Sequence, residues 1–169
     1  AYAQHMARDL ANTPANLMTP KDMVSFAQHT FENSPVAVKV YDRNDAKKLN
    51  MNAFLSVAKG SDCAPYFLTL TLNPSRSAPT SLVGKGVTFD SGGISIKPSR
   101  SMGDMKGDMS GAAAVLAAMH GLQAIGTKKH VVALIPLVEN MPSANAYKPG
   151  DVLTAMNGKT IEVINTVAE

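Results

Sequence analysis

The stretch VGKGVTFDSGGISIKPSRSMGDMKGDMSGAAAV, from Val83 to Val115, decides how the rest of the chain is interpreted. It holds seven glycines, and its charged groups include three lysines and three aspartates: Lys85, Lys97, Lys106, Asp90, Asp104 and Asp108. Glycine loses more backbone entropy on folding than any other residue, so this density is costly unless tight turns or a bound group require it. We therefore expect a binding or catalytic site here, on a scaffold formed by the rest of the chain.

The segments on either side of this stretch alternate between strand and helix patterns. Leu82–Val87 is predicted as a strand that leads into it. Ser110–Ile125, rich in small and apolar residues, is predicted as a helix that ends at Gly126. The near-continuous apolar run His130–Val138 is typical of a central strand covered on both faces.

The remaining segments continue this alternation. Thr19 is expected to cap a helix whose apolar face includes Met23, Phe26, Ala27 and Phe31. The other predicted elements are helices at 3–11, 43–48 and 51–58, strands at 36–41 and 66–72, and a hairpin over 152–165 that turns at Asn157-Gly158. Alternating strands and helices predict one domain with an α/β fold, in which helices cover both faces of a mixed sheet in three layers.

Composition excludes several classes of protein. Hydrophobic residues make up 45% of the chain, and the net charge is +3 at pH 7. The basic residues are scattered and not interleaved with aromatic residues, which argues against nucleic-acid binding. No apolar run approaches the ~20 residues that span a bilayer, so no membrane partner is expected. Cys63 is the only cysteine, which favours a reducing, intracellular setting and an unreactive thiol.

Both ends of the chain are unusual for a complete protein. The sequence opens inside a helical pattern and stops directly after a strand. We therefore expect it to be cut from a longer protein.

The central stretch has the composition of a cation site. Ligands of open α/β sheets bind at the carboxyl ends of strands, where Asp90 is expected to lie, followed by a turn at Gly92-Gly93. Asp108 precedes the next helix, and Glu169 also follows a strand. Carboxylates with a lysine suit Mg²⁺, Mn²⁺ or Zn²⁺. Taken singly, each residue also has an ordinary interpretation: a helix cap for Asp108, a turn residue for Asp90 and surface charges for the lysines. A phosphate-binding loop is not predicted, because neither GxxxxGK[ST] nor GxGxxG occurs.

Longer motifs point to a family. VGKGVTFDSGGISIKPS, followed by DMKGDMSGAAAV, resembles the leucyl aminopeptidase family of cytosolic dinuclear metallopeptidases. Supporting motifs occur along the chain: ARDLANTPANLMTP, AFLSVAKGS, ENMPSANAYKPGDVL and NGKTIEV. The resemblance implies that residues 1–169 are an incomplete carboxyl-terminal catalytic domain. The family's amino-terminal domain and the remainder of its catalytic domain would then be absent.

The resemblance also implies roles for individual residues. Two ions, Zn²⁺ or Mn²⁺, would be held by Lys85, Asp90, Asp108 and Glu169, with Asp90 and Glu169 shared between them. Lys97 matches the lysine that polarises the scissile carbonyl, and Met105 matches a wall of the pocket for the first side chain of the substrate. The implied activity removes amino-terminal residues from peptides with a free amino terminus. The implied assembly is a homo-oligomer, a hexamer.

One position departs from the family pattern. The family motif NTDAEGR reads NTVAE here, so Val167 replaces a metal-ligating aspartate, and the family arginine falls past the last residue. Valine offers only its main-chain carbonyl, so we expect one metal site to be weakened and the peptidase to be impaired. Three interpretations stay open: an impaired aminopeptidase, a catalytically degenerate member kept as a structural or binding protein, and an unrelated α/β binding domain, against which the motif density argues.

Overall fold

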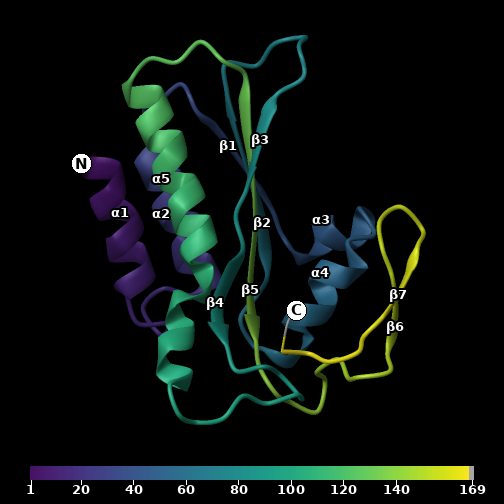
Figure 1. Ribbon diagram of the computed structural model, residues 1–169. Coiled ribbons are helices and arrows are strands. Elements are labelled where there is room, and N and C mark those ends of the chain that lie inside the picture. The colour runs from purple at the N-terminus through teal and green to yellow at the C-terminus, as the bar shows by residue number, and fades with distance from the viewer. Residues whose placement is uncertain (168–169) are drawn as a thin grey trace.

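A mixed sheet built around β5 (Val131–Asn140) forms the centre of the computed structural model, which describes residues 1–167 (Figure 1). β2 (Tyr66–Leu72) pairs antiparallel with one edge of β5, and β1 (Ala37–Tyr41) pairs antiparallel with β2. On the other edge, β3 (Thr80–Val83) and β4 (Gly86–Asp90) pair in parallel with successive parts of β5. The apolar run that predicts a central strand is therefore confirmed as one.

Helices cover both faces of this sheet, as Figure 1 shows. α1 (Tyr2–Asn12), α2 (Pro20–Phe31) and α5 (Ser110–Ala124) lie on one face, and α3 (Arg43–Lys48) and α4 (Asn52–Val57) lie on the other. The predicted three-layer α/β/α arrangement is confirmed. None of the helices in the described part of the chain combines the length and apolar character needed to cross a membrane.

Local sequence sets the limits of several helices. Thr19 caps α2 and forms a capping box with Asp22, while Asp42 caps α3 and forms a capping box with Asp45. Gly126 follows α5 with a φ of 67°, a left-handed conformation that stops the helix. These limits agree with the prediction because each depends on residues a few positions apart.

The main core lies between the sheet and the three helices α1, α2 and α5. Each fully buried aliphatic side chain contributes about 1.5–3 kcal/mol relative to an exposed one. The largest of these side chains come from the helical segments and from β2 and β5: Met23, Met109, Leu116, Met119, Leu68, Leu70, Leu72, Ile135 and Leu137.

The predicted strand Leu82–Val87 is interrupted, which corrects the sequence-based expectation. β3 ends at Val83 and β4 begins at Gly86, with the same alignment to β5 on both sides of the break. Lys85 leaves the ladder because its carbonyl accepts a hydrogen bond from Ala112 N of α5, at 2.8 Å. The helix therefore takes over a backbone group that the sheet would otherwise use.

Three smaller elements complete the fold. The predicted hairpin is present as β6 (Val152–Thr154) and β7 (Thr160–Glu162), with Gly158 at a φ of 82° in its turn. Two 3₁₀ helices, η1 (Ala58–Gly60) and η2 (Met102–Met109), extend α4 and precede α5 respectively, and the sequence patterns predict neither. η2 matters for the site because it carries two of the predicted residues.

Candidate metal centre

Asp90 lies at the carboxyl end of β4, where the sequence predicts it. The alignment of β4 with β5 shifts between Val87 and Asp90, and such an irregularity changes the direction in which a strand presents its side chains. The Asp90 side chain is only 1% exposed. Gly92 and Gly93 have φ values of 89° and 65°, so the chain turns away directly after the aspartate.

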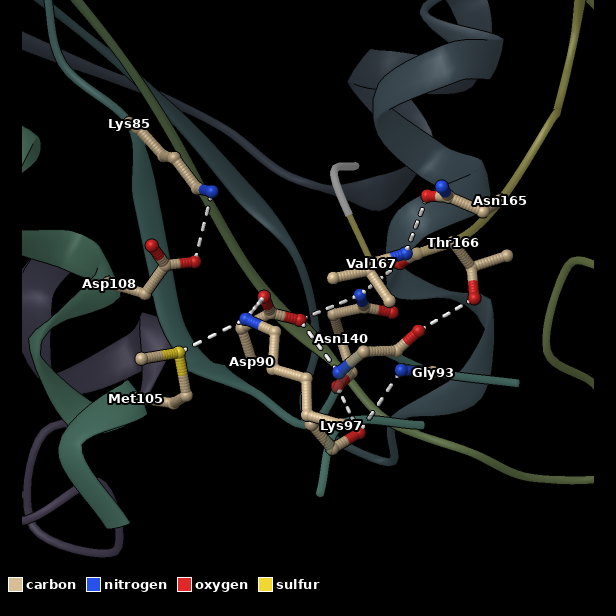
Figure 2. A network of polar contacts seen from close by, with 12 residues as sticks. Lys85, Asp90, Gly93, Lys97, Met105, Asp108, Asn140, Asn165, Thr166 and Val167 are labelled. Carbon is tan, nitrogen blue, oxygen red and sulfur yellow. Dashed lines mark hydrogen bonds and ion pairs between the residues drawn. The ribbon is translucent and has the colours of Figure 1, made fainter. Parts of the chain in front are cut away.

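Hydrogen bonds fix the Asp90 carboxylate in one orientation (Figure 2). Its Oδ1 accepts from Gly92 N at 2.9 Å and from Asn140 Nδ2 at 2.8 Å. Its Oδ2 faces the Lys97 ammonium, with which it forms an ion pair. One carboxylate oxygen is thus held by the scaffold, while the other is presented to a cation.

Lys97 brings the predicted oxyanion-stabilising group to this carboxylate. It lies in the loop after β4, and its main-chain N donates to Ser91 O at 2.9 Å. Its Nζ also lies 3.0 Å from Met105 Sδ, which projects from η2. Lys97 is therefore in direct contact with two other predicted site residues, Asp90 and Met105, as Figure 2 shows.

Lys85 and Asp108 form a second charged pair. Lys85 Nζ lies 3.0 Å from Asp108 Oδ2, and the two side chains are 48% and 22% exposed. Lys85 lies in the break between β3 and β4, and Asp108 lies in η2. The interpretation of Asp108 as a cap of α5 is wrong, because the N-cap of that helix is Met109. Lys85 and Lys97 are paired with acids instead of being free surface charges, whereas Lys106 donates to the Asn12 carbonyl at 2.8 Å.

Glycines around Lys85 allow α5 to approach the strand break. A Cβ atom on Gly84 would lie 2.6 Å from Gly111 O, and one on Gly111 would lie 2.9 Å from Lys85 N. Both contacts are shorter than real Cβ contacts allow, and both are with backbone. Part of the glycine density in the central stretch is therefore explained by close packing of a helix on a strand.

A buried polar network ties the carboxyl-terminal segment to this centre. Asn140 Nδ2 donates to Thr166 O at 2.7 Å, and Thr166 Oγ1 donates to Gly92 O at 2.6 Å. Val167 follows directly, and Glu169 lies outside the described residues. Sequence reasoning missed both Asn140, which lies in the supporting motif ENMPSANAYKPGDVL, and Thr166, which lies in the segment NTVAE that departs from the family pattern.

The donor set fits a divalent cation in part. Asp90 and Asp108 supply carboxylates and Lys85 supplies an amine, and these groups suit Mn²⁺ or Zn²⁺ when the amine is neutral. Within residues 1–167, no group of three or more His, Cys, Asp and Glu side chains could hold an ion. The described residues therefore supply only part of a coordination shell, and the side chain of Val167 adds no donor to it.

The sequence of the chain matches known proteins. A model of the catalytic domain of the cytosol aminopeptidase family matches residues 5–169. A probable cytosol aminopeptidase of Alkaliphilus metalliredigens is 47% identical over 171 residues, which cover 100% of this chain and 34% of that protein. Another, of a Chelativorans species, is 50% identical over 167 residues, which cover 98% of this chain and 34% of that protein.

Solved structures agree with the sequence matches. The bottromycin maturation enzyme BotP in complex with Mn has a TM-score of 0.92 and is 39% identical, over 98% of this chain and 36% of that one. The cytosol aminopeptidase from Coxiella burnetii has a TM-score of 0.92 and is 35% identical, over 97% and 36% respectively. The chain spans about a third of the length of these relatives. Although it covers only this part of them, the chain belongs to the cytosol aminopeptidase family.

Proposed function

We propose that the protein containing this chain is a metal-dependent aminopeptidase that releases amino-terminal residues from peptides. The observation that carries the proposal is the contact of Lys97 with both Asp90 and Met105, beside the Lys85–Asp108 pair, in a member of the cytosol aminopeptidase family. This arrangement joins a cation-binding carboxylate, a positive charge and an apolar wall. We further propose that residues 1–169 are the first part of the carboxyl-terminal catalytic domain.

Lys85, Asp90 and Asp108 would hold divalent cations, together with Glu169 from beyond the described residues. When bound, such ions lower the pKa of a water molecule and polarise the carbonyl of the scissile bond. The Mn bound to BotP supports Mn²⁺ as one candidate, and the family resemblance supports Zn²⁺ as another. The fixed Oδ1 of Asp90 leaves its Oδ2 as the oxygen available to a cation.

Lys97 would supply the charge for the developing oxyanion. Its side chain is 21% exposed, and its ammonium group is held between the Asp90 carboxylate and the Met105 sulfur. A positive charge that is already in place needs no reorganisation when negative charge develops on the substrate oxygen. Met105 would form part of the wall against the first side chain of the substrate. The carboxylates nearby would attract its free amino group.

Val167 favours an impaired enzyme, with a catalytically degenerate binding or structural protein as the second candidate. Its side chain has no lone pair, so only its carbonyl could contact an ion where the family has a carboxylate. Loss of one preorganised stabilising group costs about 3 kcal/mol of barrier, which is a hundredfold or more in rate. The hexamer and the cytoplasmic location implied by the resemblance stay predictions.

Metal content and hydrolysis of a leucyl amide test the proposal directly. Both would be measured for the intact protein and for Val167→Asp. We expect Val167→Asp to bind an additional metal ion per chain and to raise kcat by about a hundredfold, because it restores a missing donor. Ile164→Asp is the matched control, since Ile164 is a nearby apolar residue that is 75% exposed. It should change neither quantity.

The outcomes separate the two candidate functions. Two bound ions and efficient turnover without any substitution would refute the impairment but support the peptidase. One ion or none and no turnover, both corrected by Val167→Asp, would favour the degenerate member. If Val167→Asp changes neither metal content nor turnover in a protein that binds no metal, the assignment of the centre is wrong.

A further inference from the structure

We propose that Asn140 is a positioning residue of the metal centre, whose buried amide sets Asp90 and the segment around Val167 in one relative arrangement. The inference rests on the proposed function, because the effect of Asn140 is expressed through metal binding. Asn140 is the last residue of β5 and is 0% exposed. It lies in contact with the centre without being one of the groups predicted to ligate an ion.

Both hydrogens of the Asn140 amide are used, and each goes to a different part of the chain. Nδ2 donates to Asp90 Oδ1 at 2.8 Å and to Thr166 O at 2.7 Å (Figure 2). The first partner is 50 positions away in sequence and the second is 26 positions away. A single side chain thus joins the end of β4 to the carboxyl-terminal segment.

The bond to Asp90 restricts rotation of the carboxylate. Oδ1 is held by two donors, Asn140 Nδ2 and Gly92 N, so Oδ2 is the oxygen turned toward Lys97. Without the amide donor, the carboxylate keeps one scaffold bond and gains freedom to rotate about its side-chain torsions. Outer partners of this kind orient metal ligands, and removing them typically weakens metal affinity by about 10–100-fold.

The bond to Thr166 fixes the segment that carries Val167. Thr166 is 0% exposed, its Oγ1 donates to Gly92 O at 2.6 Å, and it accepts from Ser95 N at 2.9 Å. These bonds fasten Thr166 to the loop after β4. The Asn140 amide adds the link between Thr166 and the end of β5, so the segment next to Val167 is held from both sides.

The main chain of Asn140 anchors the amide itself. Its carbonyl accepts from Ser91 N at 3.0 Å and from Ser91 Oγ at 2.7 Å. These two bonds hold the main chain of Asn140 in place at the end of β5, and its side chain extends from there to the metal centre. An aspartate here would lose both donors and would place a second carboxylate against Asp90, so the amide is the group that this position requires.

Mn²⁺ binding to the intact, metal-free protein tests the proposal. Isothermal titration calorimetry would compare the unaltered protein with Asn140→Leu and Asn140→Ser, and thermal unfolding without metal would record their stability. We expect both variants to bind Mn²⁺ about 10–100-fold more weakly. Asn140→Ser is the milder change, and it keeps the test valid if Asn140→Leu does not fold.

Thr88→Val is the matched control. Thr88 is also 0% exposed and lies on β4, and its Oγ1 donates to Val138 O of β5 at 3.3 Å. The substitution removes a buried hydrogen bond from the same strand pair without touching Asp90 or Thr166. We expect it to lower thermal stability while its Mn²⁺ affinity stays unchanged.

Each outcome decides the proposal. If the unaltered protein binds no Mn²⁺, the proposed function fails and this inference fails with it. Equal Mn²⁺ affinity in the unaltered protein and in the Asn140 variants would overturn the positioning role alone. The positioning role is also overturned if Thr88→Val weakens Mn²⁺ binding as much, or if neither Asn140 variant folds, since Asn140 would then act through general stability.

Discussion

The charged residues of the candidate metal centre form two pairs of opposite charge. Asp90 faces the ammonium of Lys97, and Asp108 faces that of Lys85. Of the two carboxylates only that of Asp90 is buried, and removing Lys97 would leave its charge uncompensated. An incoming divalent cation has the same sign as the ammonium groups, so it must compete with them for the carboxylate oxygens. Lys85 and Lys97 therefore influence the affinity of the centre for a cation, in addition to their roles in the proposed chemistry.

Cys63 lies outside this centre and is expected to react slowly. Burial of the thiol is the main cause that raises its pKa, and the charge of the nearby Glu139 carboxylate adds to it. The thiolate is the nucleophile, so alkylation by iodoacetamide at pH 8 should be slower than for an unstructured cysteine peptide, and it should accelerate as the pH rises. Mass spectrometry over time measures the rate.

Two variants resolve the causes of this slow reaction. Glu139→Gln removes the carboxylate charge, so it should lower the pKa of Cys63 and speed alkylation. Asp62→Asn should have a smaller effect, because the Asp62 charge is the weakest of the contributions. A rate equal to that of the free peptide, with no response to Glu139→Gln, would contradict the environment described for Cys63.

At the scale of secondary-structure elements, α5 packs against the β3–β4 break with no room for a side chain at Gly84. A Cβ on Gly84 would lie 2.6 Å from Gly111 O and 2.9 Å from Ala112 Cα. We expect Gly84→Ala to lower the free energy of unfolding by about 1–3 kcal/mol, because the helix must move away from the strand. Urea denaturation measures the change.

Gly103→Ala provides the comparison for this substitution. Gly103 lies in η2, and a Cβ there would meet nothing within 4 Å. The Gly103→Ala variant should therefore have the same urea midpoint of unfolding as the unaltered protein. If Gly84→Ala also leaves the midpoint unchanged, the close approach of α5 to the strand break is not a determinant of stability.

The elements also show which features a sequence can predict. The Asn157-Gly158 hairpin and the capping box of Thr19 and Asp22 are encoded within a few residues, so they could be predicted. The break at Lys85 could not, because it depends on a hydrogen bond from Ala112, which is distant in the sequence. η2 could not be predicted either, because its eight residues show no strong periodic pattern and 3₁₀ helices of that length are uncommon.

The same limit applies to the centre. The carboxylates and lysines could be proposed from residue types and from the family resemblance. Asn140 could not, because an asparagine after an apolar run has no distinctive chemistry until the fold brings it to Asp90 and Thr166. Glu169 lies outside the described residues, so its assignment stays a prediction.

At the scale of the whole molecule, metal binding should stabilise the fold. Asp90 comes from β4 and Asp108 from η2, so an ion held by both binds the folded chain and not the unfolded one. We expect Mn²⁺ at about 100 times its dissociation constant to add about 2.7 kcal/mol to the stability of the intact protein. Differential scanning calorimetry, with and without a chelator, measures the gain.

Two substitutions locate the source of that gain. Asp90→Asn should abolish most of the response to Mn²⁺, while Asp62→Asn, at an exposed position away from the centre, should keep it. An undiminished response in Asp90→Asn would mean that Mn²⁺ stabilises the protein from another site.

The position of β5 in the sheet also determines at what stage of synthesis the five-stranded sheet can form. β5 pairs with β2 on one edge and with β3 and β4 on the other, yet it is made after all three. β1 and β2 can pair with each other as they emerge. Within residues 1–167, the strand that pairs with β3 and β4 is β5, so both wait until residues 131–140 leave the ribosome. Unpaired strands are prone to wrong contacts. The nascent chain therefore passes through a vulnerable interval in which Asp90 already exists but the strand that holds it in place does not.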